Sequence, residues 1–287
     1  MKISLIKPDS INVNPWVDEF RRQGVEVLVN DASEDCDFII CNSVSQMGNL
    51  SRVHKQYPDI PMINYNWDFY PWLWKHARGY DWHGYGRMLK ESVEVWVSST
   101  AVWKRTDENF GVGDKSKVIL TFVRDLDYPL EKIRDDRFVF QPMRRYEHDK
   151  TDGWLKRACE ELNIPLLESN HKLSEADFKE KIATCSFMVM PYYECSTGGL
   201  SVIEAVKFGK VTLMNDSEYQ GGSDYLGDKA RYFQAESYED MKAKIKEMWE
   251  DTPTIDLDEA SEFMEKYTVE KMVAAMKERL DALAGAK

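Results

Sequence analysis

The sequence predicts an α/β protein made of two consecutive Rossmann-like units, each built on a parallel β-sheet. In the first half, apolar runs of four to six residues alternate with segments of helical periodicity. The same alternation begins again at Phe138, after a charged segment at 124–137. Apolar runs of this length between helical segments are typical of strands that are buried on both faces of a parallel sheet. We therefore expect a first unit at 1–124 and a second unit at 125–267.

The first unit contains one clear amphipathic helix and six runs that favour strands. The helix is predicted at PWVDEFRRQG, residues 15–24. The predicted strands are 2–6, 25–29, 37–42, 61–66, 93–99 and 117–122.

The second unit repeats this organisation, and a further amphipathic helix follows it. Its predicted strands are 138–143, 164–169, 187–192, 210–215 and 230–234, and its predicted helices are 150–163, 174–185, 200–209 and 238–251. The last helix starts near Thr268, which is a plausible side-chain cap, and has Glu270 in its first turn. In parallel sheets of this kind, ligands bind at the carboxyl ends of the strands.

Composition excludes several classes of protein. The chain has 287 residues, a net charge of -12, and 5 cysteines without a CxxC pair. The acidic surplus argues against nonspecific binding to DNA or anionic lipid, because phosphate contacts need a local excess of Lys and Arg. The scattered cysteines indicate neither a disulfide framework nor a zinc knuckle. Since there is no signal-peptide core and no run of roughly 18 apolar residues, we expect a cytoplasmic protein without membrane insertion.

A glycine-rich segment lies between a predicted strand and a predicted helix. Backbone N–H groups at such a helix start contact anions, and the helix dipole adds an attraction of about 0.3 to 1 kcal/mol per charge. The segment is therefore a candidate seat for a diphosphate, and a simple tight turn is the alternative. Its residues are Ser196, Thr197, Gly198, Gly199, Leu200 and Ser201.

The residues around this turn resemble the donor-binding region of retaining glycosyltransferases of family four. The resemblance lies in GGLSVIEA at 198–205 and YLGDKA at 225–230. It implies the GT-B architecture of two facing Rossmann-like domains, with the turn amides on the diphosphate and Glu204 on the ribose hydroxyls. An exposed helical Glu is the alternative for Glu204. Ser196 stands where the family has its first Glu, and the nearest acid is Glu194. Either the turn carries a two-residue insertion, or the carboxylate on the sugar side has been lost.

Two cations upstream have the spacing of the family's Arg and Lys. They are Arg145 and Lys150, with Arg144 as a competitor for the Arg role. By this resemblance they hold the departing nucleoside diphosphate. Cations fixed in a dry site stabilise charge that develops in the transition state, by about 1.5 to 3 kcal/mol for each charge-assisted hydrogen bond. Solvent-facing charges are the alternative.

The resemblance covers about 93–285 and weakens toward the N-terminus. It implies that the closing helix, 268–287, packs back on the first unit, and that the first unit lies on the acceptor side. Asp68 stands near the position of a family His-Asp pair, so it is a candidate for contact with the acceptor or the sugar, and a turn-capping Asp is the alternative. Aromatic side chains stack on sugar rings. The candidate acceptor residues are Trp67, Tyr70 and Trp72, with a loop that covers the core as the alternative.

These observations predict a glycosyltransferase that moves a hexose from a UDP- or GDP-linked sugar to a hydroxyl acceptor with retention of configuration. We expect no cofactor and no metal, because the Asp-x-Asp spacings at 35–37 and 125–127 arise readily by chance in an acidic chain. The acceptor is a carbohydrate or another hydroxyl compound, and a modified DNA base is a less favoured alternative. Two other functions stay open, a nucleotide-sugar epimerase of the same fold and a degenerate protein that binds sugar nucleotides without turnover.

Overall fold

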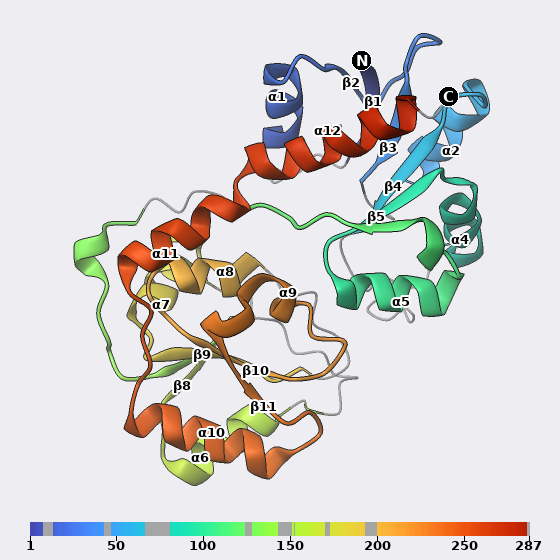
Figure 1. Ribbon diagram of the computed structural model, residues 1–287. Coiled ribbons are helices and arrows are strands. Elements are labelled where there is room, and N and C mark those ends of the chain that lie inside the picture. The colour runs from blue at the N-terminus through green and yellow to red at the C-terminus, as the bar shows by residue number, and fades with distance from the viewer. Residues whose placement is uncertain are drawn as a thin grey trace. The chain divides into compact units, whose positions relative to one another are not determined.

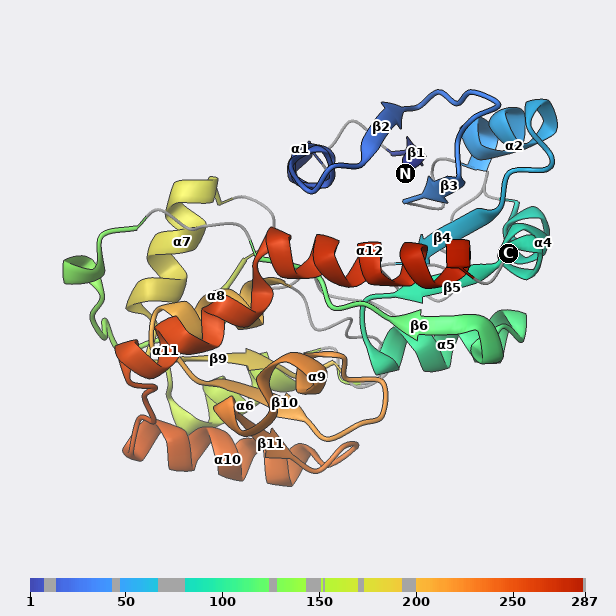
Figure 2. The same cartoon turned by 45° about the horizontal axis from the view of Figure 1, so that its top comes forward.

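The computed structural model describes residues 1–7, 14–42, 47–66, 81–123, 128–142, 151, 153–169, 173–192 and 200–285. The chain forms two compact units, which Figures 1 and 2 show from two directions. Unit 1 comprises Met1–Arg124 together with Tyr267–Lys287, and unit 2 comprises Asp125–Lys266.

The sheet of unit 1 has six strands in the order β2-β1-β3-β4-β5-β6. Every neighbouring pair is parallel. The order reverses between β1 and β3, so the carboxyl ends of these two strands flank the switch point of the sheet. The strands are β1 (Lys2–Ile6), β2 (Glu26–Val29), β3 (Phe38–Cys41), β4 (Met62–Asn66), β5 (Glu94–Val97) and β6 (Ser116–Val118).

The helices of unit 1 begin with side-chain caps where the sequence provides them. Asp81 accepts a hydrogen bond of 2.8 Å from the backbone N–H of Gly84, and Ser99 accepts one of 3.2 Å from Val102. Such caps satisfy N–H groups that the first helical turn leaves without partners. The helices are α1 (Asn14–Arg22), α2 (Met47–Gln56), α4 (Trp82–Glu91), α5 (Thr100–Phe110) and α12 (Val269–Gly285).

One predicted strand of unit 1 is shorter than expected. The apolar run at 117–122 was expected to be a strand throughout, whereas β6 ends at Val118. Ile119 still donates a backbone hydrogen bond of 2.8 Å to Val97. Ile119 and Phe122 are buried in the core cluster of unit 1. Packing on the core therefore accounts for the rest of this apolar run.

The C-terminal helix α12 belongs to the core of unit 1, and Figure 1 shows it beside α1. Its buried residues recur at intervals of three and four, which places them on one face of the helix. That face packs into a cluster with residues from α1 and from sheet strands. The members from α12 are Met272, Val273, Met276 and Leu280, and those from the other elements include Ile3, Trp16, Phe20, Ile40 and Trp96.

A buried carboxylate on β5 forms an ion pair with α12. Glu94 is only 5% exposed, and Trp96 on the same strand donates its indole N–H to Glu94 Oε2 at 3.0 Å. The Arg279 guanidinium reaches the same carboxylate from α12, with Nε 3.3 Å from Oε2 and Nη2 bonded to Oε1. Because Glu94 is buried, these donors offset the cost of removing its charge from water.

Unit 2 has a five-stranded sheet in the order β11-β10-β9-β7-β8, again with every neighbouring pair parallel. Two parallel sheets of six and five strands confirm the predicted fold class. The strands are β7 (Val139–Gln141), β8 (Leu166–Glu168), β9 (Phe187–Met190), β10 (Thr212–Asn215) and β11 (Ala230–Phe233).

Helices cover both faces of the sheet of unit 2. Figures 1 and 2 show α6 and α10 on one face, and α7, α8 and α11 on the other. The helices of the unit are α6 (Trp154–Leu162), α7 (Glu175–Thr184), α8 (Leu200–Lys207), α9 (Gly222–Leu226), α10 (Tyr238–Glu250) and α11 (Leu257–Met264).

A charged cluster joins α6 to α10. Glu161 accepts a hydrogen bond of 2.8 Å from Arg157 Nε and a second one from Lys242 Nζ. Hydrogen bonds, first from Lys242 and then from Arg157, lower the pKa of Glu161 to about 2. The Arg157 guanidinium also lies 4.3 Å from the centre of the Tyr238 ring.

We expect Arg279→Met to destabilise unit 1, because it leaves the Glu94 carboxylate buried with one donor fewer. Removing one partner of a buried pair costs about 3 to 5 kcal/mol, and the partial exposure of Arg279 reduces the expected loss to about 1 to 3 kcal/mol. The double variant Glu94→Gln/Arg279→Met should lose less, because a neutral amide is less costly to bury. Urea unfolding of the variants measures both values, and a double variant less stable than Arg279→Met would contradict this role of Glu94.

We expect the stability of unit 2 to fall with pH in the acid range partly through Glu161. Its folded-state pKa lies below the ordinary value of 4.5, so its contribution is present above about pH 4.5 and is lost as the pH falls toward 2. Glu161→Gln should flatten that part of the pH dependence, whereas Glu250→Gln, at an exposed carboxylate of α10, should not. Thermal unfolding between pH 6 and 2.5 measures the effect, and equal curves for the wild type and Glu161→Gln would refute it.

Candidate functional site

The switch point of unit 2 lies between β7 and β9, where the strand order reverses. In sheets of this type the crevice outside the carboxyl ends of the switch-point strands binds ligands. The chain leaves β7 after Gln141 toward 143–150 and leaves β9 after Met190 toward 193–199. The predicted diphosphate-binding cations and the glycine-rich turn thus follow the two strands that flank one switch point.

A network of buried polar side chains joins the carboxyl ends of three strands at this edge. Gln141, at the end of β7, donates a hydrogen bond of 2.7 Å to the Tyr192 hydroxyl just beyond β9, and both residues are buried. Asn215, at the end of β10, donates to the Tyr192 carbonyl and accepts a hydrogen bond of 3.0 Å from the Ser217 backbone N–H. Buried amides with satisfied hydrogen bonds have a single favourable orientation. The network therefore fixes where the segments after β7, β9 and β10 begin.

Helix α8 begins at the end of the glycine-rich segment and places three predicted site residues. Leu200 and Ser201 are half-buried in its first turn, and Glu204 in the second turn is only 6% exposed. The considered alternative, an exposed helical Glu204, is thus wrong. A buried carboxylate is costly unless it has hydrogen-bonding or charged partners. The first-turn N–H groups of α8 and the Glu204 carboxylate together offer donors for a phosphate and acceptors for hydroxyl groups.

The far end of α8 is fixed by a close backbone approach. Gly209 has a φ of +68°, and a Cβ at this position would lie 2.8 Å from the Ile255 carbonyl oxygen. Ile255 donates a backbone hydrogen bond of 2.9 Å to Gly209 at the same place. Glycine is the residue that fits both the left-handed backbone and the short distance. This contact holds α8 in place beside the segment that leads into α11.

Gln220 is a candidate site residue that sequence reasoning missed. It follows β10 and is 2% exposed, and its Oε1 accepts a hydrogen bond of 3.2 Å from the Gly222 backbone N–H. Its Nε2 is buried without a hydrogen-bond partner in the part of the chain that the structure describes. A buried amide donor of this kind costs free energy until a partner fills the position. The only sequence signal for it is its place a few residues after a predicted strand.

The corresponding edge of unit 1 also ends in buried polar side chains. Asn66, at the end of β4, donates a hydrogen bond of 2.6 Å to Thr106 on α5 and accepts one of 3.2 Å from the Tyr85 hydroxyl on α4. Lys7, directly after β1, is 5% exposed and donates its backbone N–H to Asn30 Oδ1 at 2.8 Å. Asn42, directly after β3, is buried as well.

Most of the predicted site residues lie outside the described residues. These are the donor-side residues Arg144, Arg145, Lys150, Glu194, Ser196, Thr197, Gly198 and Gly199, and the acceptor-side residues Trp67, Asp68, Tyr70 and Trp72. Their assigned roles remain predictions from the sequence. In sequence, these residues follow the ends of β4, β7 and β9.

Carboxylates and thiols that could bind a metal or act as nucleophiles have structural roles instead. Asp37 accepts the Lys2 backbone N–H at 2.8 Å and Asp35 accepts Lys2 Nζ at 3.0 Å, so this Asp-x-Asp pair supports the start of β1. Burial raises the pKa of Cys159 and of Cys185 to about 12, which disfavours the nucleophilic thiolate. Within the described ranges, no three His, Cys, Asp or Glu side chains gather as metal ligands would. None of the described helices is long and apolar enough to cross a bilayer.

Comparisons with known proteins place the fold among the GT-B glycosyltransferase structures. No protein-family model matches the sequence, and no curated protein matches it in sequence. HepE from Anabaena, crystallised with UDP, is similar in structure with a TM-score of 0.64 and 14% identity over 98% of this chain and 100% of HepE. Sucrose-phosphate synthase from Thermosynechococcus elongatus has a TM-score of 0.69 and 12% identity over 100% of both chains. The galactosyltransferase WaaB of the lipopolysaccharide outer core has a TM-score of 0.68 and 10% identity over 98% of this chain and 99% of WaaB.

We expect Tyr192→Phe to destabilise unit 2, because it leaves the Gln141 amide buried without its acceptor. An unsatisfied buried donor costs about 1 to 3 kcal/mol. The double variant Tyr192→Phe/Gln141→Leu should be less destabilised than the sum of the two single variants, since it removes both polar partners. Urea unfolding of the four proteins gives this coupling free energy. A coupling close to zero would show that the hydrogen bond does not stabilise the edge.

Proposed function

We propose that the chain is a GT-B glycosyltransferase that moves a hexose from a UDP-linked sugar to a hydroxyl acceptor with retention of configuration. The supporting observation is at the switch point of unit 2, where the segments after β7 and β9 begin side by side and α8 starts with the half-buried Leu200 and Ser201. UDP is the favoured nucleotide because HepE, a structurally similar protein, was crystallised with UDP and with UDP-glucose.

In this proposal the donor's diphosphate lies at the N-terminal end of α8. The amides of 197–200 and of the first turn of α8 bind its oxygens, and Glu204 accepts hydrogen bonds from the ribose hydroxyls. Arg145 and Lys150 approach the same oxygens from the segment that follows β7. These interactions suit a nucleoside diphosphate, because its ribose ring carries the negatively charged diphosphate on one side and two neighbouring hydroxyl groups on the other.

The catalytic step depends on charge at the leaving group. As the glycosidic bond to the diphosphate breaks, the sugar becomes oxocarbenium-like and the leaving oxygen gains negative charge. Arg145 and Lys150 stabilise that charge more in the transition state than in the bound donor, which is the condition for acceleration of the reaction. The electrostatic role falls to these side chains and the helix start, so we propose that no metal and no cofactor takes part. The acceptor side would be formed by unit 1, with Asp68 and the aromatic residues Trp67, Tyr70 and Trp72.

We propose the cytoplasm as the compartment. The four described cysteines, Cys36, Cys41, Cys159 and Cys185, are free thiols and buried. Free thiols are usual in reducing compartments.

The first test is nucleotide binding measured by thermal shift. UDP should raise the unfolding temperature by binding to the folded state, and GDP should do so less. Glu204→Gln should weaken UDP binding about tenfold or more, because hydrogen bonds to a charged acceptor contribute about 1.5 to 3 kcal/mol. The matched control is Glu250→Gln on α10, which should leave UDP binding unchanged. A protein that no nucleoside diphosphate stabilises would contradict the proposal.

The second test is release of UDP from UDP-glucose or UDP-galactose, with or without added hydroxyl acceptors. Arg145→Ala and Lys150→Ala should lower the rate about tenfold or more each while the unfolding temperature stays the same, and Lys246→Ala on α10 is the control. Sugar interconversion without UDP release would identify an epimerase. Tight binding without any turnover would identify a degenerate sugar-nucleotide-binding protein. Both results would replace the transferase proposal.

A further inference from the structure

The side chain of Asn215 joins the exits of two neighbouring strands. Asn215 is the last residue of β10, which pairs in parallel with β9, and it is fully buried. Its Nδ2 donates a hydrogen bond of 3.4 Å to the Pro191 carbonyl and a second one to the Tyr192 carbonyl. Pro191 and Tyr192 directly follow β9, and the chain continues from them toward the glycine-rich segment. Asn215 therefore contacts the main chain shortly before the predicted diphosphate-binding turn.

This contact extends the connection between β9 and β10 past the end of their pairing. The last paired residues of the two strands are Met190 and Met214. Beyond them the chain leads to α8 on one side and to α9 on the other, so a longer reach is needed to join the two exits. The Asn215 side chain provides that reach, and its amide donates two N–H groups where a backbone position donates one.

The orientation of the Asn215 amide is set from both sides. Oδ1 accepts a hydrogen bond of 3.0 Å from the Ser217 backbone N–H, while Nδ2 donates to the two carbonyls after β9. A backbone N–H can only donate and a carbonyl can only accept, so exchanging the amide oxygen and nitrogen would satisfy none of these groups. The amide thus has one favourable orientation, and it holds the exits of β9 and β10 in one relative position.

The exit of β10 is in turn fixed to the exit of β11. Asp216 donates its backbone N–H to the Phe233 carbonyl at 3.0 Å, and its carboxylate accepts the Ala235 backbone N–H at 2.6 Å. Asn215 therefore connects the main chain after β9 to a part of the sheet edge that has further hydrogen bonds of its own.

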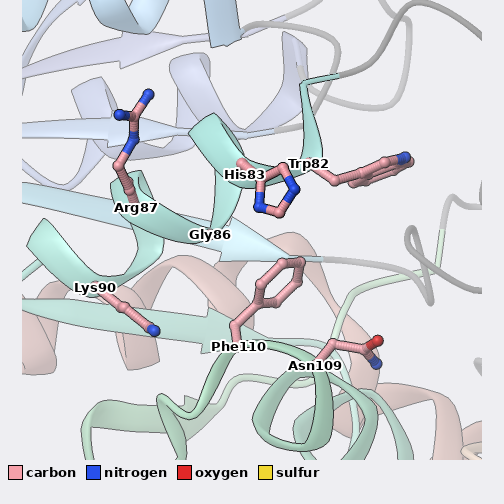
Figure 3. Close-up of a pocket in the computed structure, with 7 residues that line it drawn as sticks. All are labelled: Trp82, His83, Gly86, Arg87, Lys90, Asn109 and Phe110. Atoms are coloured by element: carbon pink, nitrogen blue, oxygen red, sulfur yellow. The ribbon is translucent and has the colours of Figure 1, made fainter.

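The hollow between α4 and α5 of unit 1, with a volume of about 620 Å³, has a different arrangement of polar groups. Figure 3 shows the Arg87 and Lys90 side chains directed apart there. The Phe110 ring packs against Gly86, where a Cβ would lie 2.8 Å from Phe110 Cδ1. The polar groups around Asn215, by contrast, meet at one side chain.

We propose that Asn215 is a positioning residue for the diphosphate of the donor. It acts through the main chain of Pro191 and Tyr192, which sets the place from which the glycine-rich segment begins, and not through contact with the nucleotide. Backbone N–H groups bind phosphate oxygens well when they are held in the binding arrangement beforehand. This inference rests on the proposed function, and it assigns part of the affinity for the second phosphate to a buried residue of β10.

The test compares UDP with UMP in calorimetric titrations of the full-length protein. The dissociation constant of UMP divided by that of UDP measures what the second phosphate adds to binding. Asn215→Ala should lower this ratio about threefold to tenfold, as expected for the loss of a hydrogen bond that supports the turn, while the affinity for UMP changes by less than about twofold. Unfolded protein lowers the number of binding sites and not the dissociation constant, so a loss of stability alone leaves the ratio unchanged.

Two further substitutions at this position sharpen the test. Asn215→Asp keeps an acceptor for the Ser217 N–H but replaces the donor to Pro191 and Tyr192 with a carboxylate oxygen, so it should lower the ratio at least as much as Asn215→Ala. Asn215→Ser keeps a hydroxyl that is too short to reach both sides. It carries the same expectation as Asn215→Ala and replaces it in the test if Asn215→Ala does not fold.

Ser217→Ala and Met248→Ala are the matched controls. Ser217→Ala removes the Oγ that accepts the Tyr219 backbone N–H at 3.1 Å, but it leaves the backbone N–H that binds Asn215. Met248→Ala creates a cavity at a buried position of α10 and so lowers stability without touching the Asn215 contacts. Both variants should keep the ratio within about twofold of the wild type.

The outcomes separate this inference from the proposed function. An unchanged ratio in Asn215→Ala and Asn215→Asp, with a lower unfolding temperature only, would show a purely structural role and overturn the inference, while UDP binding by the wild type would leave the proposed function standing. An equal loss in Met248→Ala would overturn the inference as well. A wild type that binds neither UDP nor UMP would contradict the proposed function, and the inference with it.

Discussion

Parallel pairing of every strand is the constraint on which both units depend. Since parallel strands all run the same way, each sheet collects its carboxyl ends on one edge, and every chain segment that leaves this edge must return through a crossover. In unit 2 the strand order reverses between β7 and β9, which are paired neighbours in the sheet. Topology alone therefore makes that edge the expected place for a ligand, before any side chain is considered.

Buried polar side chains fix the direction in which the chain leaves the sheet at this edge. Gln141, Tyr192 and Asn215 join three strand ends in unit 2. In unit 1, Asn66 joins the end of β4 to Thr106 on α5 and Tyr85 on α4. Apolar residues at these positions would bury as well, but they would not fix the direction in which the following segments leave the sheet. Hydrogen bonds between amides and hydroxyls do so, because a buried amide without partners is costly.

Unit 1 depends on residues from both ends of the chain. The apolar face of α12 completes a core that begins with β1 and α1, and Arg279 reaches Glu94 across 185 positions of sequence. A charged pair in such a place adds little net stability but disfavours other docking positions for the helix.

The sequence by itself determined the fold class, because strand and helix periodicities are local and each strand is apolar enough to be recognised. It also singled out Glu204 and the glycine-rich turn through the order of neighbouring residues. Helices α2, α4, α9 and α11 were not predicted. Helices α2 and α4 contain glycines, which disfavour a helix as long as the surface on which it packs is unknown. Only the tertiary structure decided that Glu204 is buried, that Gln141 and Tyr192 meet across 51 positions, and that the Phe110 ring packs against Gly86. Such contacts join residues far apart in sequence, and neither partner has a local pattern that names the other.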